Sequence, residues 1–506
     1  MKKTILALIL VLCLLSTGGL AEAARSLPED ETITITILEG VNSNKENNAV
    51  EQAVQEKLNI KLEYTYVPSA NFDEKINTVL ASGELPDVIS FLWKQAVPAA
   101  WVEQDAVLRL DDPENNLLEK YGQNITRFWT EESMPYQYDY NGGIYSVKQY
   151  NAFPYLNSMM IRYDWLETLN LEAPTTVEEF VEVMRRFKND DPNGNGMADE
   201  IPFMVLNGDL QVFLDAFGIK RVVGNYTEYE GKLIPMYEHP EFKNCVDLLR
   251  QLYSEGLIDS EYTVRDIPSR DELVSTDKVG VTYATGNEST KLTKSLRANG
   301  FEKALLGYIP PMKGVGGQNI QGRYPYSTCM AISSTAKDPE ACMMFIDYLF
   351  SDEGIELTNF GVEGVHHEKV DGEPRLQEPY CTSWENARGA GIAKGTWAQV
   401  WTEDNFLQIT FQGKTLEELD EVDALAYHAY VDNAEFAYYA LPASLTDTET
   451  NRKLSADIWS PMKDEMDNYI MGISDWDSFE SLLKELKEYG MDQITQEVND
   501  NYNLSK

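Results

Sequence analysis

Residues 32–67 read TITITILEGVNSNKENNAVEQAVQEKLNIKLEYTYV, and this stretch decides the fold class. Thr and Ile alternate from residue 32 and the run ends at Gly40, which predicts a strand that enters a loop. Apolar residues then recur at helical spacing over residues 49–58, and the two-residue period returns over residues 60–67. The stretch therefore predicts a strand, a helix and a second strand in succession.

The next segments continue this alternation. An apolar stripe at helical spacing covers residues 72–80 and stops at Gly83, with Pro86 just beyond. Residues 87–91 (DVISF) then predict a short buried strand. Strands that alternate with helices predict an α/β fold with a parallel sheet. The loops beyond the carboxyl ends of such strands are where a ligand crevice is expected.

Two segments are candidates for the crossings that lead the chain from one lobe to the other. Strand patterns over residues 142–149 and 156–163 flank the first of these crossings, and residues 308–311 (YIPP) mark the second. From residue 415 onward the pattern is helical, with little strand signal.

The first residues have the pattern of a secretory signal. Two lysines precede an apolar run over residues 5–15, and an Ala-Glu-Ala sequence follows at residues 21–23. The run is short for a membrane span. A lipoprotein needs a small residue before its modified cysteine, whereas Cys13 follows a leucine inside the apolar run. We therefore expect a signal peptide over residues 1–23 and a released, extracytoplasmic protein, with lipid anchoring as the less favoured alternative.

The composition is acidic and globular. The chain of 506 residues has 83 acidic against 42 basic residues and a formal net charge of -41, which disfavours binding to nucleic acid and to anionic lipid. An aromatic content of 11% excludes a disordered acidic tail as the source of the charge. In an oxidising compartment, one or two disulfides or buried free thiols are both open for the cysteines after residue 23: Cys245, Cys329, Cys342 and Cys381.

The sharpest local motif is DPNGNGMADEIP at residues 191–202. Side-chain oxygens fall at its positions 1, 3, 5 and 9, with glycine at position 6, and this arrangement wraps a calcium ion. Position 12 is Pro202, so Glu200 has to supply the last carboxylate. The alternative is a solvated turn without metal. We favour a structural calcium site made by Asp191, Asn193, Asn195, Asp199 and Glu200.

Aromatic residues are the next signal, because sugar rings stack on aromatic faces while polar side chains take the hydroxyl groups. Trp165 and Trp476 lie in helical patterns, where core packing is the better interpretation. Trp93 follows the strand at residues 87–91, where the crevice is expected. We expect stacking contacts from Trp93, Tyr283, Trp384, Trp397 and Trp401, and hydroxyl contacts from Glu39 and Asn42 at the end of the first strand.

The sequence gives little support to catalysis. His366 and His367 are adjacent, so they point in different directions and do not form a ligand pair in a regular element, and a polar loop is the preferred interpretation. None of the common hydrolase, zinc-protease or nucleotide-binding motifs is present. With 83 acidic residues some pair of carboxylates is always close together, so an argument for a glycosidase from paired carboxylates has no force.

Several stretches, spread from residue 33 to about residue 500, carry a resemblance to a known family. They include KINTVLASGELPD at 75–87, IRYDWL at 161–166, PTTVEEF at 174–180, the loop at 191–202, LYSEGLID at 252–259, IPPMKG at 309–314, FIDYLFSDEG at 345–354, FGVEGVH at 360–366 and ISDWDSF at 473–479. The chain resembles the family 1 extracellular solute-binding proteins, in particular the long type similar to oligo-alginate-binding proteins. The resemblance implies a periplasmic-binding-protein type II fold with two lobes and hinge strands. It also implies calcium ligands at Asp191, Asn193, Asn195, the Met197 carbonyl, Asp199 and Glu200.

What the resemblance implies about function is the capture of a carbohydrate, with a permease of an ABC importer as partner. We expect a monomeric binding protein without enzymatic activity. The expected N-terminal lobe is residues 27–148 plus 310–352, and the expected C-terminal lobe is residues 149–309 plus 353–506. We expect the lobes to close by a hinge motion around an oligosaccharide. A secreted glycoside-active enzyme, a ligand sensor and a peptide binder on the same fold remain alternatives.

Overall fold

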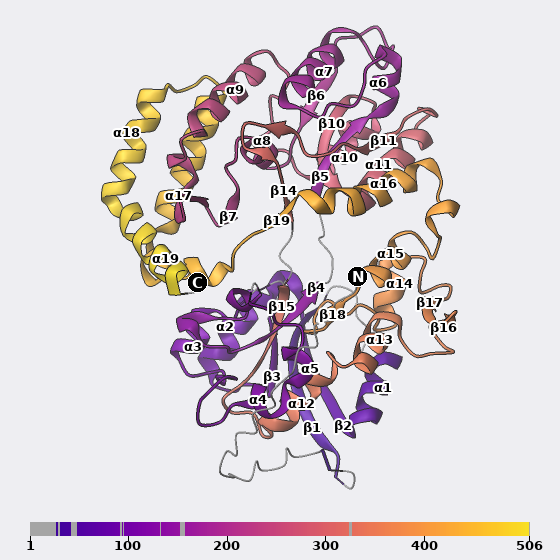
Figure 1. Cartoon of the computed structure of the whole chain (residues 1–506), viewed down its shortest axis with the longest axis vertical. Helices are drawn as coiled ribbons and strands as arrows, with labels where there is room; N and C mark the ends of the chain where they lie inside the picture. The colour runs from indigo at the N-terminus through magenta and orange to yellow at the C-terminus, as the bar shows by residue number, and fades with distance from the viewer. Residues whose placement is uncertain are drawn as a thin grey trace, which may run out of the picture.

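The computed structural model has two lobes, each built on a β-sheet (Figure 1). The signal peptide predicted for residues 1–23 lies outside the described part of the chain. Among the residues that are described, no helix has the length and apolar character needed to cross a bilayer. The structure describes residues 27–28, 31–41, 48–91, 94, 96–131, 133–151, 157–322 and 326–504.

The predicted strand–helix–strand unit begins the N-terminal lobe. β1 (Ile33–Val41) runs parallel to β2 (Ile60–Pro68), with α1 (Ala49–Leu58) between them in the chain. Asn48 caps α1, because its side-chain oxygen accepts a hydrogen bond from the Glu51 amide at 3.0 Å. The period read from the sequence thus matches the observed elements.

The following elements also match. α2 (Phe72–Ser82) ends at Gly83, whose φ of 71° is left-handed and suits glycine. β3 (Val88–Phe91) is buried along its length and pairs in parallel with β1. In the described residues the complete sheet has the order β18-β4-β15-β3-β1-β2.

This sheet is mixed, whereas the sequence predicts a parallel one. β15 (Tyr326–Ile332) runs antiparallel to both β3 and β4 (Val147–Asn151), and β18 (Val400–Trp401) runs parallel to β4. The reason is the route of the chain: β15 enters from the second lobe at the edge where β1, β3 and β4 end, so it must run in the opposite direction. The carboxyl ends of β1, β3, β4 and β18 therefore share one edge.

The C-terminal lobe is built on a four-stranded sheet in the order β11-β5-β10-β6 within the described ranges. β5 (Asn157–Arg162) leaves the boundary between the lobes, and β10 (Val279–Thr285) and β11 (Leu306–Tyr308) pair with it antiparallel. β6 (Ile201–Met204) runs parallel to β10. β6, β10 and β11 therefore end at the edge that faces the N-terminal lobe.

Helices cover both sheets (Figure 1). Those of the N-terminal lobe also include α3 (Ala99–Glu103), α4 (Leu117–Tyr121), α5 (Gln123–Thr126), α12 (Pro339–Tyr348), α13 (Asp352–Phe360), α14 (Trp384–Gly389) and α15 (Glu403–Thr410). Those of the C-terminal lobe include α6 (Tyr163–Leu169), α7 (Val177–Asn189), α8 (Gln211–Ala216), α9 (Phe242–Ser254), α10 (Ile267–Ser275) and α11 (Gly286–Ala298).

The structure places residues 353–411 with the N-terminal lobe, whereas the sequence-based boundaries assign them to the C-terminal lobe. β18 extends the N-terminal sheet, and Trp397 and Val400 lie in one hydrophobic core with Ile35 and Val50. The hairpin of β16 (His367–Val370) and β17 (Glu373–Leu376) belongs to the same region. Sequence periodicity does not reveal this assignment, because it depends on pairing with β4, far back in the chain.

The second crossing also lies later than residues 308–311. β11 ends at Tyr308 within the C-terminal sheet, and the hairpin of β12 (Lys313–Gly314) and β13 (Gly317–Gln318) packs on α8 of that lobe. β14 (Ile320–Gly322) pairs with β19 (Ala437–Tyr439), a strand within the C-terminal portion that the sequence predicts as helical. The next described element, β15, already belongs to the N-terminal sheet.

The C-terminal portion is otherwise helical, as predicted, and follows a third crossing after α15. α16 (Glu421–Asp432) packs against α11, and α17 (Glu449–Ile470) packs against α9. α18 (Trp476–Leu486) and α19 (Asp492–Leu504) complete the outer side of this lobe (Figure 1). Cys245, Cys329, Cys342 and Cys381 are free and buried, which resolves the cysteine alternatives for the described part of the chain.

Candidate functional site

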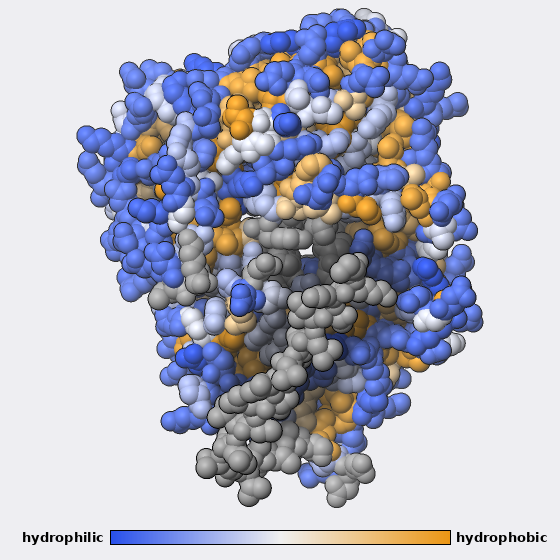
Figure 2. All heavy atoms as spheres, in the orientation of Figure 1, coloured by the Kyte–Doolittle hydropathy of each residue, from blue (hydrophilic) through white to orange (hydrophobic). Residues whose placement is uncertain are grey.

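The candidate site lies where the strand ends of the two sheets face each other. β1, β3, β4 and β18 end at this boundary from one side, and β6, β10 and β11 from the other. Hydrophilic residues predominate on the face of the two lobes seen in the space-filling view (Figure 2). The sequence-based expectation for the crevice, at the carboxyl ends of strands, agrees with this arrangement. Asn42 and Trp93, two of the predicted ligand contacts, lie outside the described residues.

Glu39, near the end of β1, takes part in a buried charge cluster. Lys394 Nζ lies 3.0 Å from Glu39 Oε1 and 2.6 Å from Glu51 Oε1, and all three side chains are at most 1% exposed. Burial raises the pKa of Glu39, and the Lys394 charge opposes this rise. In this conformation the Glu39 carboxylate therefore pairs with Lys394. It does not face a ligand, whereas the sequence-based hypothesis requires that it does.

Trp397 is likewise interior. Its side chain is fully buried, with the Phe345 ring edge-on at 5.7 Å between centroids and Lys394 Nζ 4.6 Å from its own centroid. The backbone around it is fixed to the sheet, since Thr328 Oγ1 donates to the Gly395 carbonyl at 2.9 Å. The ring therefore offers no face to a ligand in this conformation, contrary to the role expected from its polar sequence neighbours.

Trp384 and Trp401 are brought together. Their ring centroids lie 6.0 Å apart at an interplanar angle of 31°, and both side chains are half-buried. Phe406 of α15 lies 5.8 Å from Trp384 and 5.0 Å from Tyr430 of α16, so the aromatic cluster reaches from the N-terminal lobe to the C-terminal lobe. Trp401 pairs in register with Asn151, the end of β4. The two tryptophans thus lie next to two of the three crossings.

Tyr283 lies near the carboxyl end of β10, on the C-terminal side of the boundary. Its side chain is half-buried and packs against the large core of that lobe, and burial raises its pKa. It thus combines an aromatic face with a hydroxyl at the edge where a ligand is expected. Of the predicted stacking residues that the structure describes, Tyr283, Trp384 and Trp401 keep partly exposed side chains.

A polar cluster that no sequence pattern predicts lies beside Tyr283. The Tyr438 hydroxyl of β19 and the Gln211 amide both donate to Asp215 Oδ1 at 2.6 Å, and Lys220 Nζ lies 5.4 Å from the Tyr438 ring centroid. Burial raises the pKa of Asp215 to about 7, and the two hydrogen bonds oppose this rise. Residues 437–439 form a strand inside a helical segment, so no periodic signal could have placed Tyr438 here.

The loop after α7 has the backbone that a calcium site needs. Asp191 Oδ1 accepts a hydrogen bond from the Asn195 amide at 3.0 Å, and its Oδ2 accepts one from the Gly196 amide at 3.0 Å. Asn193 Oδ1 also accepts from the Asn195 amide, at 3.1 Å. Gly196 has a φ of 74°, which glycine at position 6 permits. These hydrogen bonds direct the side-chain oxygens of Asp191 and Asn193 toward the inside of the loop.

The carboxylates of this loop suit a cation. Burial and the charges of Asp191 and Asp199 raise the pKa of Glu200, and Glu200 Oε1 is buried without a hydrogen-bond partner among the described residues. Asp199 is instead stabilised as a carboxylate, because Asn195 donates to it at 3.0 Å and Lys278 Nζ lies 3.0 Å away, and its pKa is lowered. The predicted donor set therefore fits a hard divalent cation, with the Met197 carbonyl as the remaining oxygen.

Comparison with known proteins places these features in a family. Residues 42–356, more than half of the chain, match the family model for the bacterial extracellular solute-binding protein. Lipoprotein LipO of Bacillus subtilis is 28% identical over 63% of this chain and 64% of its own length. FusA of Streptococcus pneumoniae, described as a fructooligosaccharide ABC transporter substrate-binding protein, is 28% identical over 62% of this chain and 59% of its own length. The chain thus aligns with less than two thirds of these relatives.

Solved structures support the fold. The alginate-binding protein AlgQ2, solved without calcium ion, superposes with a TM-score of 0.69 and 22% identity over 95% of this chain and all of that chain. This likeness confirms the two-lobed binding-protein fold expected from the sequence. Together with the family match, it leads to one conclusion: the chain belongs to the family of bacterial extracellular solute-binding proteins.

Proposed function

We propose that this protein captures a carbohydrate outside the cytoplasmic membrane, closes its lobes around it and delivers it unaltered to the permease of an ABC importer. The main support is the boundary between the lobes. The strands of two separate sheets end there, the chain crosses it three times, and partly exposed aromatic rings lie beside it. Such rings stack on sugars, and the neighbouring polar groups suit hydroxyls. The description of FusA as a fructooligosaccharide transporter subunit supports the ligand class.

The ligand-facing residues we propose are Tyr283, Trp384 and Trp401, with Tyr438 as a further candidate. Asn42 and Trp93 remain proposed contacts from the N-terminal lobe. Glu39 and Trp397 are buried beneath this surface, where both contact Lys394. Closure brings the ligand contacts of the C-terminal lobe close to those of the N-terminal lobe, so both lobes contribute to the binding energy.

Isothermal titration calorimetry against a panel of neutral and acidic oligosaccharides tests the proposal. We expect at least one sugar to bind, solution scattering to show a smaller radius of gyration with that sugar, and mass spectrometry to recover it uncleaved. Tight binding of a peptide with no response to any sugar would contradict the carbohydrate proposal. A cleaved sugar would identify the rival glycoside-active enzyme, and capture of a membrane receptor instead of a permease in a pull-down would identify a sensor.

A calcium ion held by residues 191–200 is the second part of the proposal. Its support is the inward turn of the Asp191 and Asn193 oxygens and the unpaired buried oxygen of Glu200. The loop ties the end of α7 to β6 and, through Asn193, to the Asp277 carbonyl at 2.9 Å. The ion would therefore act on the stability of the C-terminal lobe and take no part in sugar contacts.

A further inference from the structure

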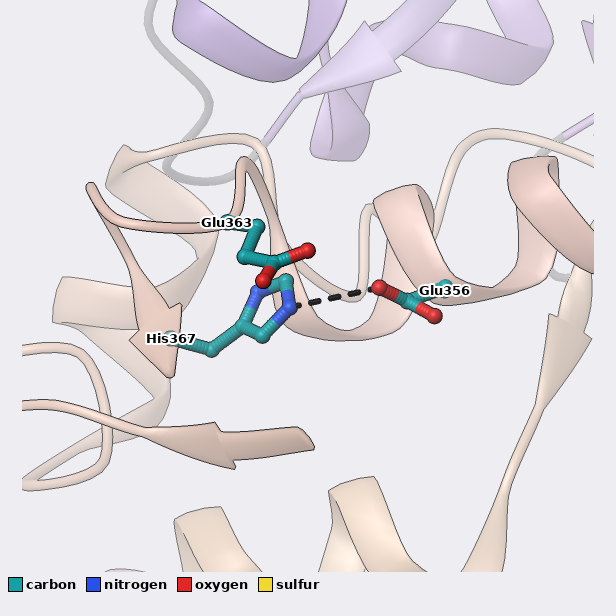
Figure 3. Close-up of side chains that lie close together, drawn as sticks. All are labelled: Glu356, Glu363 and His367. Carbon is teal, nitrogen blue, oxygen red and sulfur yellow. Dashed lines mark ion pairs between the residues drawn. The ribbon is translucent and has the colours of Figure 1, made fainter. Parts of the chain in front are cut away.

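Three side chains converge on one point of the N-terminal lobe, away from the proposed calcium loop. Glu356 comes from α13, Glu363 from the loop that follows it, and His367 from the first residue of β16 (Figure 3). Their potential ligand atoms all lie within 4.8 Å of one another. The sequence around His366 and His367 predicts only a polar loop, because the local pattern does not show that Glu356 of α13 lies next to His367.

His367 is oriented as a metal ligand. Its side chain is 1% exposed, and its Nδ1 lies 3.0 Å from the Phe360 carbonyl oxygen. Since a carbonyl only accepts, Nδ1 carries the hydrogen, and Nε2 is the ring nitrogen that faces Glu356. In histidine ligands, a hydrogen bond from the other ring nitrogen to a backbone carbonyl commonly fixes this tautomer.

The surroundings of His367 Nε2 favour a bound cation. Nε2 has no hydrogen-bond partner in the described parts of the chain, and Glu356 Oε1 faces it at 3.4 Å (Figure 3). A buried ring nitrogen and a carboxylate oxygen at this separation need a proton or a metal ion between them. Two ligands of a tetrahedral zinc ion, each about 2.1 Å from the metal, lie about 3.4 Å apart, which matches this separation.

Backbone hydrogen bonds fix the elements that carry Glu356, Glu363 and His367 without a bound ion. Ser351 caps α13 by accepting from the Gly354 amide at 3.0 Å, which fixes the helix that carries Glu356. Within the loop, the Gly364 amide donates to the His367 carbonyl at 2.8 Å, and Glu363 and His367 form a backbone bridge. A site on such fixed elements needs little rearrangement to bind.

Lys369 currently neutralises the carboxylates. Its Nζ lies 2.9 Å from Glu356 Oε1 and 3.8 Å from Glu363 Oε2, whereas His367 Nε2 has no hydrogen bond and lies 3.4 Å from Glu356 Oε1. The lysine side chain is 38% exposed, so it can turn into solvent when a metal ion takes its place. A metal ion would satisfy the histidine as well as both carboxylates, which the ammonium does not.

An approach path exists for such an ion. The cluster opens into a pocket of about 440 Å³, and its acidic lining favours cations. The pocket is lined by Ala53, Lys57, Tyr348, Asp352, Glu353 and Leu357 together with the loop after α13.

We propose that Glu356, Glu363 and His367 bind a divalent transition-metal ion such as zinc, with water in the fourth position. One imidazole and two carboxylates favour zinc and similar ions over calcium and magnesium, which prefer sites made of oxygen alone. The ion ties the loop at 361–367 to α13. This site is independent of the calcium loop and of sugar binding.

The test is a zinc titration of protein that has first been stripped of metal and then saturated with calcium, followed by calorimetry and by metal analysis after dialysis. We expect one equivalent of zinc to bind. His367→Gln weakens this binding by at least about 100-fold, because it removes the nitrogen ligand. Lys369→Met tightens it by about three- to fivefold, because the competing ammonium is gone. His428→Gln, which alters an exposed histidine on α16, leaves it unchanged.

Glu363→Gln keeps the experiment informative if the buried His367 variant folds poorly. Glu363 is exposed, so its replacement leaves the metal-free melting temperature unchanged while weakening zinc binding at least about tenfold. Cobalt in place of zinc reports a tetrahedral site through its visible absorption. The proposal is overturned if the calcium-saturated protein takes up no zinc, or if both His367→Gln and Glu363→Gln bind zinc as the parent does.

Discussion

Arg452 of α17, in the C-terminal lobe, donates to Glu103 of α3, in the N-terminal lobe, with Nη2 2.9 Å from Oε1. The same guanidinium pairs with Asp447 at 2.8 Å and lies 5.7 Å from the ring centroid of Tyr140, also in the N-terminal lobe. This contact joins the lobes directly rather than through the chain crossings.

Glu103→Gln should therefore loosen the contact between the lobes. The pair is partly exposed, so its loss costs no more than about 1 kcal/mol and shifts the melting temperature by less than about 2 °C. We expect the distribution of inter-lobe distances, measured by spin labels in each lobe, to broaden in the ligand-free protein. Glu449→Gln, which removes an ion pair with Lys453 within α17, is the control. An unchanged distribution in Glu103→Gln would show that the pair does not restrain the lobes.

Removal of calcium should destabilise the C-terminal lobe. A ligand that binds only the folded form at 100 times its Kd adds about 2.7 kcal/mol, so a chelator should lower the melting temperature and added calcium should restore it. Glu200→Gln should reduce this response, because it removes the carboxylate that replaces position 12. Asp190→Asn, just before the loop, should keep it. A melting curve that stays the same after verified calcium removal argues against the site.

Lys394→Met should be strongly destabilising. It leaves Glu39 and Glu51 buried without their cation, which costs about 3 to 5 kcal/mol. Lys61→Met removes an exposed ion pair with Glu63 and should change the free energy of unfolding by less than about 1 kcal/mol. Urea unfolding followed by tryptophan fluorescence measures both. Equal effects of the two substitutions would contradict the structural role given to Lys394.

The stability of the protein should depend on pH through Asp215. Burial raises the folded-state pKa of Asp215 to about 7, so the folded state holds this proton between about pH 4 and pH 7 while the unfolded state loses it. Its contribution is complete below pH 4 and is lost as pH rises toward 7, by an amount on the order of 4 kcal/mol.

Asp215→Asn keeps the acceptor oxygen but cannot ionise, so it should flatten this slope. Unfolding in urea at pH 4.5 and at pH 8 measures it. Asp464→Asn, an exposed change on α17, serves as the control and should preserve the slope. If the slope of Asp215→Asn equals that of the parent, another group causes the pH dependence.

Tyr283→Leu should weaken binding of the sugar found in the calorimetric panel by about fivefold, since an aromatic contact is worth about 1 kcal/mol beyond its buried area. Tyr253→Leu removes another half-buried tyrosine, whose hydroxyl donates to the Ser260 carbonyl, and should leave the Kd unchanged. The result that counts against Tyr283 is a parental Kd in Tyr283→Leu with a normal melting temperature.

Local features of the fold could be predicted because their causes are local. The alternation in β1 and β2 and the glycine after α2 each act within a few residues, and the structure has these elements at the predicted places. The conformation of the loop at 191–200 also has local causes, since its side-chain oxygens and its glycine at position 6 lie within a few residues of each other. Calcium binding by this loop stays a prediction.

Features that depend on distant pairing could not be predicted. Trp397 has Gly, Thr and Ala as neighbours in the sequence, which suggested a loop, yet it is buried because β18 pairs with β4 and Lys394 pairs with Glu39 and Glu51. His366 and His367 do point in different directions, as expected. His366 contacts Tyr380, at 4.6 Å between ring centroids, and His367 faces Glu356, a neighbour that only the folded chain supplies.

The late position of β15 and β18 in the chain affects how the protein is made. When β4 leaves the ribosome, its partners on both sides, β15 and β18, have not yet been synthesised, since they lie beyond residue 325. The N-terminal sheet must therefore wait, with β4 unpaired, until nearly four fifths of the chain exists. The first lobe should therefore not close on a nascent chain until Trp401, which pairs with Asn151 of β4, has been synthesised.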